Sequence, residues 1–292
     1  MLVMLLLMLL LMFLCIIQSI AFITLYERHL LGSSQNRLGP TKVSFMGLVQ
    51  ALMDGVKLMK KEQLMPLHSS ELVFLLVPGI SFVVMFMEWF VLPYFFLFLS
   101  FEYSVLFFLC LVGFAVYTTL LSGVVSKSKY GMIGALRASS QSVSYEIAFA
   151  LYLLCMLIHN SLFMFGNMFS LSMIILYIPF LIMIIAELNR APFDFSEGES
   201  ELVSGYNVEF SSVAFVLLFL SEYGSLIFFS VLYSCIFFNM SLMFSLLIFS
   251  LLIFIRSSYP RYRYDYMMSL FWFKLLPISL LLLLYYTLLF YY

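Results

Sequence analysis

The chain has 292 residues, of which 64% are hydrophobic and only 10% are charged, and its formal net charge is −1. A soluble domain carries about 25% charged residues, so this composition excludes a water-soluble globular fold and predicts that a lipid bilayer surrounds the chain. The balanced charge gives no sign of a nucleic-acid partner. The histidines are scattered and the cysteines form no CxxC or Cys/His cluster, so neither a disulfide framework nor a metal site is expected. The cysteines are Cys15, Cys110, Cys155 and Cys235.

Apolar runs predict an all-α integral membrane protein with about eight transmembrane helices, most of them long enough to cross about 30 Å of hydrocarbon. No basic region precedes the first run, which predicts a retained helix and not a cleaved signal. The seventh run is short, and no internal repeat is visible. Prolines fall within three of the runs, where local kinks are expected. The predicted spans of this single domain are 2–26, 72–92, 103–125, 143–159, 168–186, 211–237, 240–255 and 270–290.

An even number of spans places both termini on one side of the membrane and the four long loops on the other. The loops are 27–71, 126–142, 187–210 and 256–269. All fourteen basic residues belong to this loop face, with Lys274 in the first turn of the last span. The positive-inside rule therefore predicts that the loops face the matrix or cytoplasm. Because the loops mix charges with apolar side chains, docking of a protein partner is favoured over simple solvation.

The first loop contains an amphipathic pattern. Apolar residues from Phe45 to Met59 recur at helical spacing, while Gln50, Asp54 and Lys57 fall on the opposite face. The pattern predicts either a helix that lies in the headgroup plane or a connecting helix packed on its own bundle.

The segment Ala186–Phe210 carries six of the fifteen acids of the chain and a single basic residue, Arg190. Such a run is either a solvated loop or a set of carboxylates that bind protons or a ligand at the membrane surface. Its acids are Glu187, Asp194, Glu197, Glu199, Glu201 and Glu209.

Carboxylates within the spans are a more specific signal. Glu222 lies mid-span, Glu146 lies one turn into a span and Glu187 ends one. A charge at the bilayer centre costs about 2.5–3.5 kcal/mol on insertion scales and usually faces a bundle interior or a wet cavity. The alternatives are proton exchange and a structural ion pair with Arg137 or Arg190. Glu88 and Glu102 are expected to be interfacial residues near the opposite face.

The sequence contains no haem motif, cluster-binding cysteine set, dinucleotide fingerprint or phosphate loop. Any redox group that takes part in the function is therefore expected on partner chains.

The long loops contain specific motifs, above all the EGESELVSG and YPRYRYD runs. The stretches are Glu27–Arg28, Gly32–Pro40, Gly47–Glu62, Gly134–Glu146, Ala186–Phe210, Glu222–Tyr223 and Ile255–Asp265. In these stretches, which cover every long loop, the chain resembles the NADH dehydrogenase subunit 1 family, the membrane subunit of respiratory complex I that meets the hydrophilic arm.

The resemblance implies a core subunit of proton-translocating NADH:ubiquinone oxidoreductase in the mitochondrial inner membrane. Its long loops would face the matrix, and both termini would lie on the intermembrane-space side. It further implies a ubiquinone tunnel with the amphipathic helix near its entrance, while FMN and the iron–sulfur clusters would belong to partner subunits. The chain itself would bind no cofactor or metal, and its partners would be ubiquinone, membrane lipids and other complex I subunits.

Two groups of site residues follow from the motif match. The tunnel group is Arg28, Arg37, Arg137, Arg190, Asp194, Arg256 and Arg261. The proton-route group is Glu146, Glu187, Asp194, Glu197, Glu199, Glu201, Glu209 and Glu222. Two other functions are considered beside this one: a structural anchor for the hydrophilic arm, and a stand-alone proton or ion transporter.

Overall fold

The computed structural model describes residues 2–66, 69–94, 101–166, 170–195 and 205–291. Within these ranges the chain is all-α, without a β-strand. Glu197, Glu199 and Glu201 of the proton-route group lie outside the described residues.

Ten α-helices and several short helical turns make up the described fold. The α-helices are α1 (Leu2–Ser34), α2 (Leu48–Lys60), α3 (Glu71–Glu88), α4 (Ser104–Ser126), α5 (Lys129–Asn160), α6 (Ile174–Glu187), α8 (Ser212–Phe238), α9 (Leu242–Ser258), α10 (Tyr264–Leu270) and α11 (Leu276–Tyr291). The turns are η1 (Phe45–Gly47), η2 (Trp89–Val91), η4 (Leu171–Met173), η5 (Gly205–Asn207) and the π-helical turn η6 (Phe271–Leu275), which joins α10 to α11.

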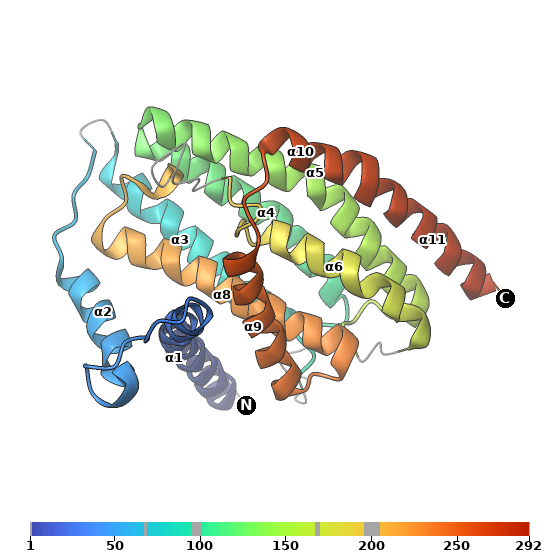
Figure 1. Ribbon diagram of the computed structural model, residues 1–292, viewed down its shortest axis with the longest axis horizontal. Helices are drawn as coiled ribbons and strands as arrows, with labels where there is room; N and C mark the ends of the chain where they lie inside the picture. Colours follow the sequence, from blue (N-terminus) through green and yellow to red (C-terminus); the bar gives the residue numbers. More distant parts are fainter. Residues whose placement is uncertain (1, 67–68, 95–100, 167–169, 196–204, 292) are drawn as a thin grey trace.

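The long helices run in roughly one direction, and α11 lies along α5 at one edge of the bundle (Figure 1). The two termini lie toward the end of the bundle where α5 and α8 finish (Figure 1). α2 stands apart at the opposite end, beside α1.

Six helices of the described chain are long and apolar enough to cross a membrane, and two shorter apolar helices accompany them. The fold is therefore that of an all-α integral membrane protein, while eight spans remain a prediction. The six are Val3–Ser34, Glu71–Val91, Ser104–Ser126, Lys129–Asn160, Ser212–Phe238 and Tyr264–Tyr291, and the shorter two are Ile174–Glu187 and Leu242–Ser258.

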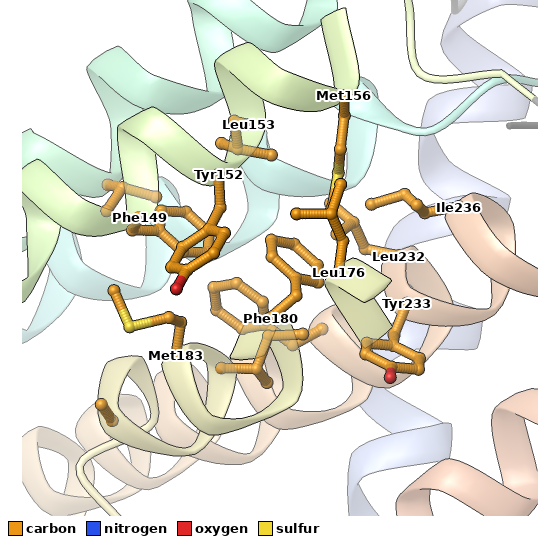
Figure 2. Close-up of a cluster of buried hydrophobic side chains, with 14 of the residues drawn as sticks. Phe149, Tyr152, Leu153, Met156, Leu176, Phe180, Met183, Leu232, Tyr233 and Ile236 are labelled. Carbon is orange, nitrogen blue, oxygen red and sulfur yellow. The ribbon is translucent and has the colours of Figure 1, made fainter. Parts of the chain in front are cut away.

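Aromatic side chains from α5, α6 and α8 form the centre of the bundle (Figure 2). The Phe149 and Phe180 rings stack with centroids 5.5 Å apart and an interplanar angle of 9°. Phe180 also stacks on Tyr233 at 6.0 Å. Because lipid tails are as apolar as these rings, close packing holds the three helices together more than transfer from water does.

Two helices extend into predicted loops. α1 continues to Ser34, and Glu27 on this part of the helix pairs with Arg190 and Arg256. α5 begins at Lys129, so most of the predicted loop 126–142 is helix. The hydroxyl of Ser128 caps this helix by accepting from the Gly131 amide at 3.1 Å.

Small residues bring α4 and α5 together. A Cβ added at Gly123 would lie within overlap distance of Ala135 on α5, at 2.1 Å from its Cβ. Close approach through small residues is typical of helix pairs in membranes, and it places the polar first half of α5 against α4.

The amphipathic helix of the first loop is α2, as predicted. Its apolar side chains are exposed in the isolated chain, and only Ala51 is buried. The exposed apolar residues are Leu48, Val49, Leu52, Met53, Val56 and Met59.

Candidate functional site

A cavity of about 440 Å³ lies inside the bundle. Its wall comes from α3, α4, α5 and α8, together with the segment that follows α6. Seven charged residues line it, of both signs: Glu88, Glu187, Arg190, Asp194, Glu222, Arg256 and Arg261.

The segment after α6 is fastened to α5 by one side chain. The Gln141 amide nitrogen is buried and donates to the carbonyl of Ala186 at 3.3 Å and to that of Phe193 at 3.2 Å. The Tyr262 amide donates to the Pro192 carbonyl at 3.0 Å. These bonds fold residues 187–193 into a closed loop that presents Glu187 and Arg190 to the cavity.

Two arginines share one buried carboxylate. Glu27 Oε1 accepts from Arg190 Nη1 at 3.2 Å and from Arg256 Nη1 at 2.5 Å. The Glu27 side chain is 5% exposed, whereas that of Arg256 is 43% exposed. The pair of guanidinium groups therefore leaves one net positive charge beside the cavity.

Arg190 also lies 4.3 Å from the ring centroid of Tyr223, in a cation–π contact. Burial lowers the pKa of Arg190, but Tyr223 and the carboxylates of Glu27 and Glu222 outweigh it, and the pKa stays above its usual value. Arg190 is thus a permanent cation.

A second ion pair joins the loop after α6 to the segment after α9. Arg261 Nη2 lies 3.3 Å from Asp194 Oδ2, with the arginine 41% exposed. The arginines therefore gather where the cavity approaches the surface.

Carboxylates occupy the inner wall. The Tyr206 hydroxyl donates to Glu222 Oε1 at 2.5 Å, and the Asn207 amide nitrogen lies 3.4 Å from the same oxygen. Tyr145 hydrogen-bonds to Glu187. Glu187 Oε2 is enclosed and has no hydrogen-bond partner among the described residues.

Glu146 does not line the cavity, although it lies close enough to interact electrostatically with Glu187. Its carboxylate faces Gly113 of α4, where an added Cβ would lie 2.9 Å from Oε1. The missing side chain at Gly113 leaves room for the carboxylate.

The structure thus brings together seven of the residues predicted from the sequence, six on the cavity wall and Glu146 behind it. They are Glu146, Glu187, Arg190, Asp194, Glu222, Arg256 and Arg261. Four others lie away from this cavity. Arg28 pairs with Asp54 of α2 at 2.7 Å, Arg37 and Glu209 are exposed, and Arg137 lies on the first half of α5.

Glu88 corrects one prediction. It was expected to be an interfacial residue, yet it is 5% exposed and lines the cavity. The apolar run containing it ends only four residues later, so the sequence suggested an interface where the bundle provides a buried wall.

Glu27 was the other missed residue, noted in the sequence only as part of a motif. Its position at the end of an apolar run, like that of Glu187, is the signal that could have identified it.

Among the residues that the structure describes, no three His, Cys, Asp or Glu side chains gather as they would around a metal ion.

Comparison with known proteins adds the family. A family model described as NADH dehydrogenase matches residues 7–287. The NADH-ubiquinone oxidoreductase chain 1 of Aedes aegypti is 42% identical over 281 residues, covering 91% of this chain and 90% of the relative. That of Artemia franciscana is 40% identical over 280 residues, covering 93% and 94%, and that of Mytilus edulis is 37% identical over 281 residues, covering 92% of each. The family model and these relatives cover nearly the whole length of the chain, and the chain belongs to the NADH dehydrogenase family.

Proposed function

We propose that this chain is a core membrane subunit of proton-translocating NADH:ubiquinone oxidoreductase, in which it forms much of the ubiquinone tunnel. The observation that carries the proposal is that one cavity is lined by three arginines and by the carboxylates of Glu88, Glu187, Asp194 and Glu222. The names of its relatives supply the substrate and the complex. The site would lie in the mitochondrial inner membrane, with the long loops in the matrix.

The chemistry of the cavity suits a quinone. Reduction of ubiquinone to ubiquinol takes up two electrons and two protons. The electrons would come from iron–sulfur clusters on partner subunits, which FMN supplies in turn, because this chain has no motif for an electron carrier. Negative charge that develops on the quinone oxygens would be stabilised by Arg190 and Arg256.

The carboxylates provide the coupling. A change of charge on the quinone shifts the proton occupancy of nearby acids, because coupled groups titrate as a set. Glu187, Glu222 and Asp194 line the same cavity, so they respond together. Proton movement out of the cavity would then follow quinone reduction.

The exposed apolar face of α2 suits the entrance. Its side chains would lie among the lipid tails while Lys57 and Lys60 reach the headgroups. A long isoprenoid tail could then pass from the bilayer beside α1 and α2 toward the cavity.

A photoaffinity ubiquinone analogue tests the tunnel in the intact complex. Labelling of α1, α2 or α8, and its suppression by excess ubiquinone, is the expected result. If the label falls only on other subunits, the chain is a structural anchor. Transport of protons by the purified chain alone would favour a stand-alone transporter instead.

The carboxylate route has its own test. Glu222→Gln removes the charge but keeps a hydrogen-bond acceptor for Tyr206. Quinone reductase activity coupled to pumping should fall, with assembly checked by native-gel co-migration with NADH-oxidising activity. Wild-type activity in an assembled variant would remove Glu222 from the route.

A further inference from the structure

Glu88 of α3 is a buried acid that neither the family motifs nor the proposed function uses. Its side chain is 5% exposed, and its Oε2 atom has no hydrogen-bond partner among the described residues. Cavity-lining residues Ser81, Val84 and Met85 precede it on the last turns of the same helix. The carboxyl group therefore belongs to the cavity wall.

The charged neighbour of Glu88 is another acid. Of the described charged groups, Glu187 is the one close enough to affect it, and both are acids. An isolated carboxylate in a low-dielectric interior is so costly that the group binds a proton instead.

The other elements packed against α3 supply no cation in the cavity. α4 contributes the hydroxyls of Thr118 and Thr119, and α8 contributes Glu222 and Tyr223. Tyr94, which follows η2, donates its hydroxyl to the Trp89 carbonyl, and burial raises its pKa, so it is not a proton acceptor.

The position of Glu88 along α3 sets its distance from the loop face. Glu88 is the last residue of a helix that begins at Glu71, so it lies roughly 26 Å along the axis from the loop face at about 1.5 Å per residue. Glu222 lies ten residues after the start of α8, roughly 15 Å from the same face. Glu88 therefore lies farther along its helix from the loops than Glu222 does.

We infer that Glu88 is a proton-binding site on the cavity wall and exchanges one proton with Glu187 through cavity water. In the exchange, the O–H bond of the Glu88 carboxylic acid breaks and a new O–H bond forms on the Glu187 carboxylate. The number of protons and the total charge of the pair do not change. The cavity, at about 440 Å³, far exceeds the roughly 10–15 Å³ that one water requires.

The inference rests on the proposed function only for the direction of proton movement. Proton binding by Glu88 itself can be measured without turnover, as the infrared C=O absorption of a buried carboxylic acid in the intact complex. The variants are Glu88→Gln, Glu88→Asp and the matched control Glu102→Gln, which makes the same change at an exposed acid before α4.

Glu88→Gln should remove one carboxylic-acid band and lower the number of protons translocated per electron pair. Glu88→Asp should restore a band and part of the pumping, and Glu102→Gln should alter neither. An unchanged spectrum in Glu88→Gln would overturn proton binding at this site.

A second variant tests proton exchange between Glu88 and Glu187, and it also tests the inference if Glu88→Gln fails to assemble. Glu187→Gln should shift the Glu88 band, because its partner no longer carries or releases a proton. A band that does not move would reject exchange between the two acids. If the wild-type complex shows the band but does not reduce ubiquinone, the proposed function fails while proton binding by Glu88 stands.

Discussion

Glu27 shows, at the scale of a single residue, how one anion organises the site. It joins the end of α1 to Arg190 after α6 and to Arg256 in the last turn of α9. Three segments far apart in the chain therefore meet at one carboxylate. Removing one partner of a buried ion pair is costly, because the remaining charge has no compensation.

The change Glu27→Gln keeps the shape of the side chain and removes its charge. Stability should fall by about 3 kcal/mol, at the lower end for a buried pair because Arg256 is partly exposed. Thermal inactivation of the purified complex measures this effect.

The matched control is Asp54→Asn, which breaks the exposed Arg28–Asp54 pair of α1 and α2. Its effect should stay below about 1 kcal/mol, as for other surface ion pairs. Equal losses in the two variants would contradict the central position of Glu27.

Arg190 leads to a prediction about pH. Its pKa is raised, so the charge and its stabilising contacts are present at every pH below that value and are lost only above it. In Arg190→Lys the same neighbours surround the new amine, but a lysine ordinarily titrates at about 10.4, whereas an arginine keeps its proton at every accessible pH. Quinone reductase activity of the variant should therefore fall toward alkaline pH more steeply than that of wild type, whose Arg190 does not titrate there. Parallel pH profiles would contradict this assignment.

At the scale of elements, α4 and α5 depend on the absence of a side chain. Gly123 lies against Ala135, and a methyl group there would overlap it. Overpacking of this kind costs about 1–3 kcal/mol.

Gly123→Ala should therefore lower the yield of assembled complex and its resistance to heat. Gly79→Ala in α3 is the control, because an added Cβ there meets nothing within 4 Å. That second change should be neutral or stabilising by up to about 1 kcal/mol, as expected for helical glycine. A heat-stable Gly123→Ala complex would show that the two helices can separate.

The same two helices show where prediction from sequence succeeded and where it failed. Apolar length located six helices that are long enough to cross a membrane and two shorter apolar ones, and the amphipathic pattern located α2. The first half of α5 escaped because its serines and Gln141 are polar, yet they bond to carbonyls of their own helix or of the loop after α6. Composition records the polarity of such side chains but not their partners.

The site shows a similar division. Asp194, Arg256 and Arg261 were named from motifs and line the cavity, while Glu88 was misplaced. Its role depends on which acid faces it across the bundle, and that is a property of helix packing and not of the run in which it lies.

At the scale of the whole molecule, the basic residues predict the orientation of the protein in the membrane. In the described structure all seven lysines are exposed: Lys42, Lys57, Lys60, Lys61, Lys127, Lys129 and Lys274. If the loop face is the matrix face, a membrane-impermeant amine reagent should label these lysines in inside-out inner-membrane vesicles. Intact mitoplasts should show none of this labelling, with an outward-facing inner-membrane protein as the control. Labelling in mitoplasts would reverse the orientation.

The two hydrogen bonds that the Gln141 side chain donates have a mechanical consequence. Because one amide holds the carbonyls of Ala186 and Phe193, the short loop between them is closed like a ring mounted on α5. Glu187 and Arg190 both belong to this closed loop, so an acid and a cation of the cavity are attached to α5 at the same point. A small rotation of α5 would therefore move both side chains in the same step.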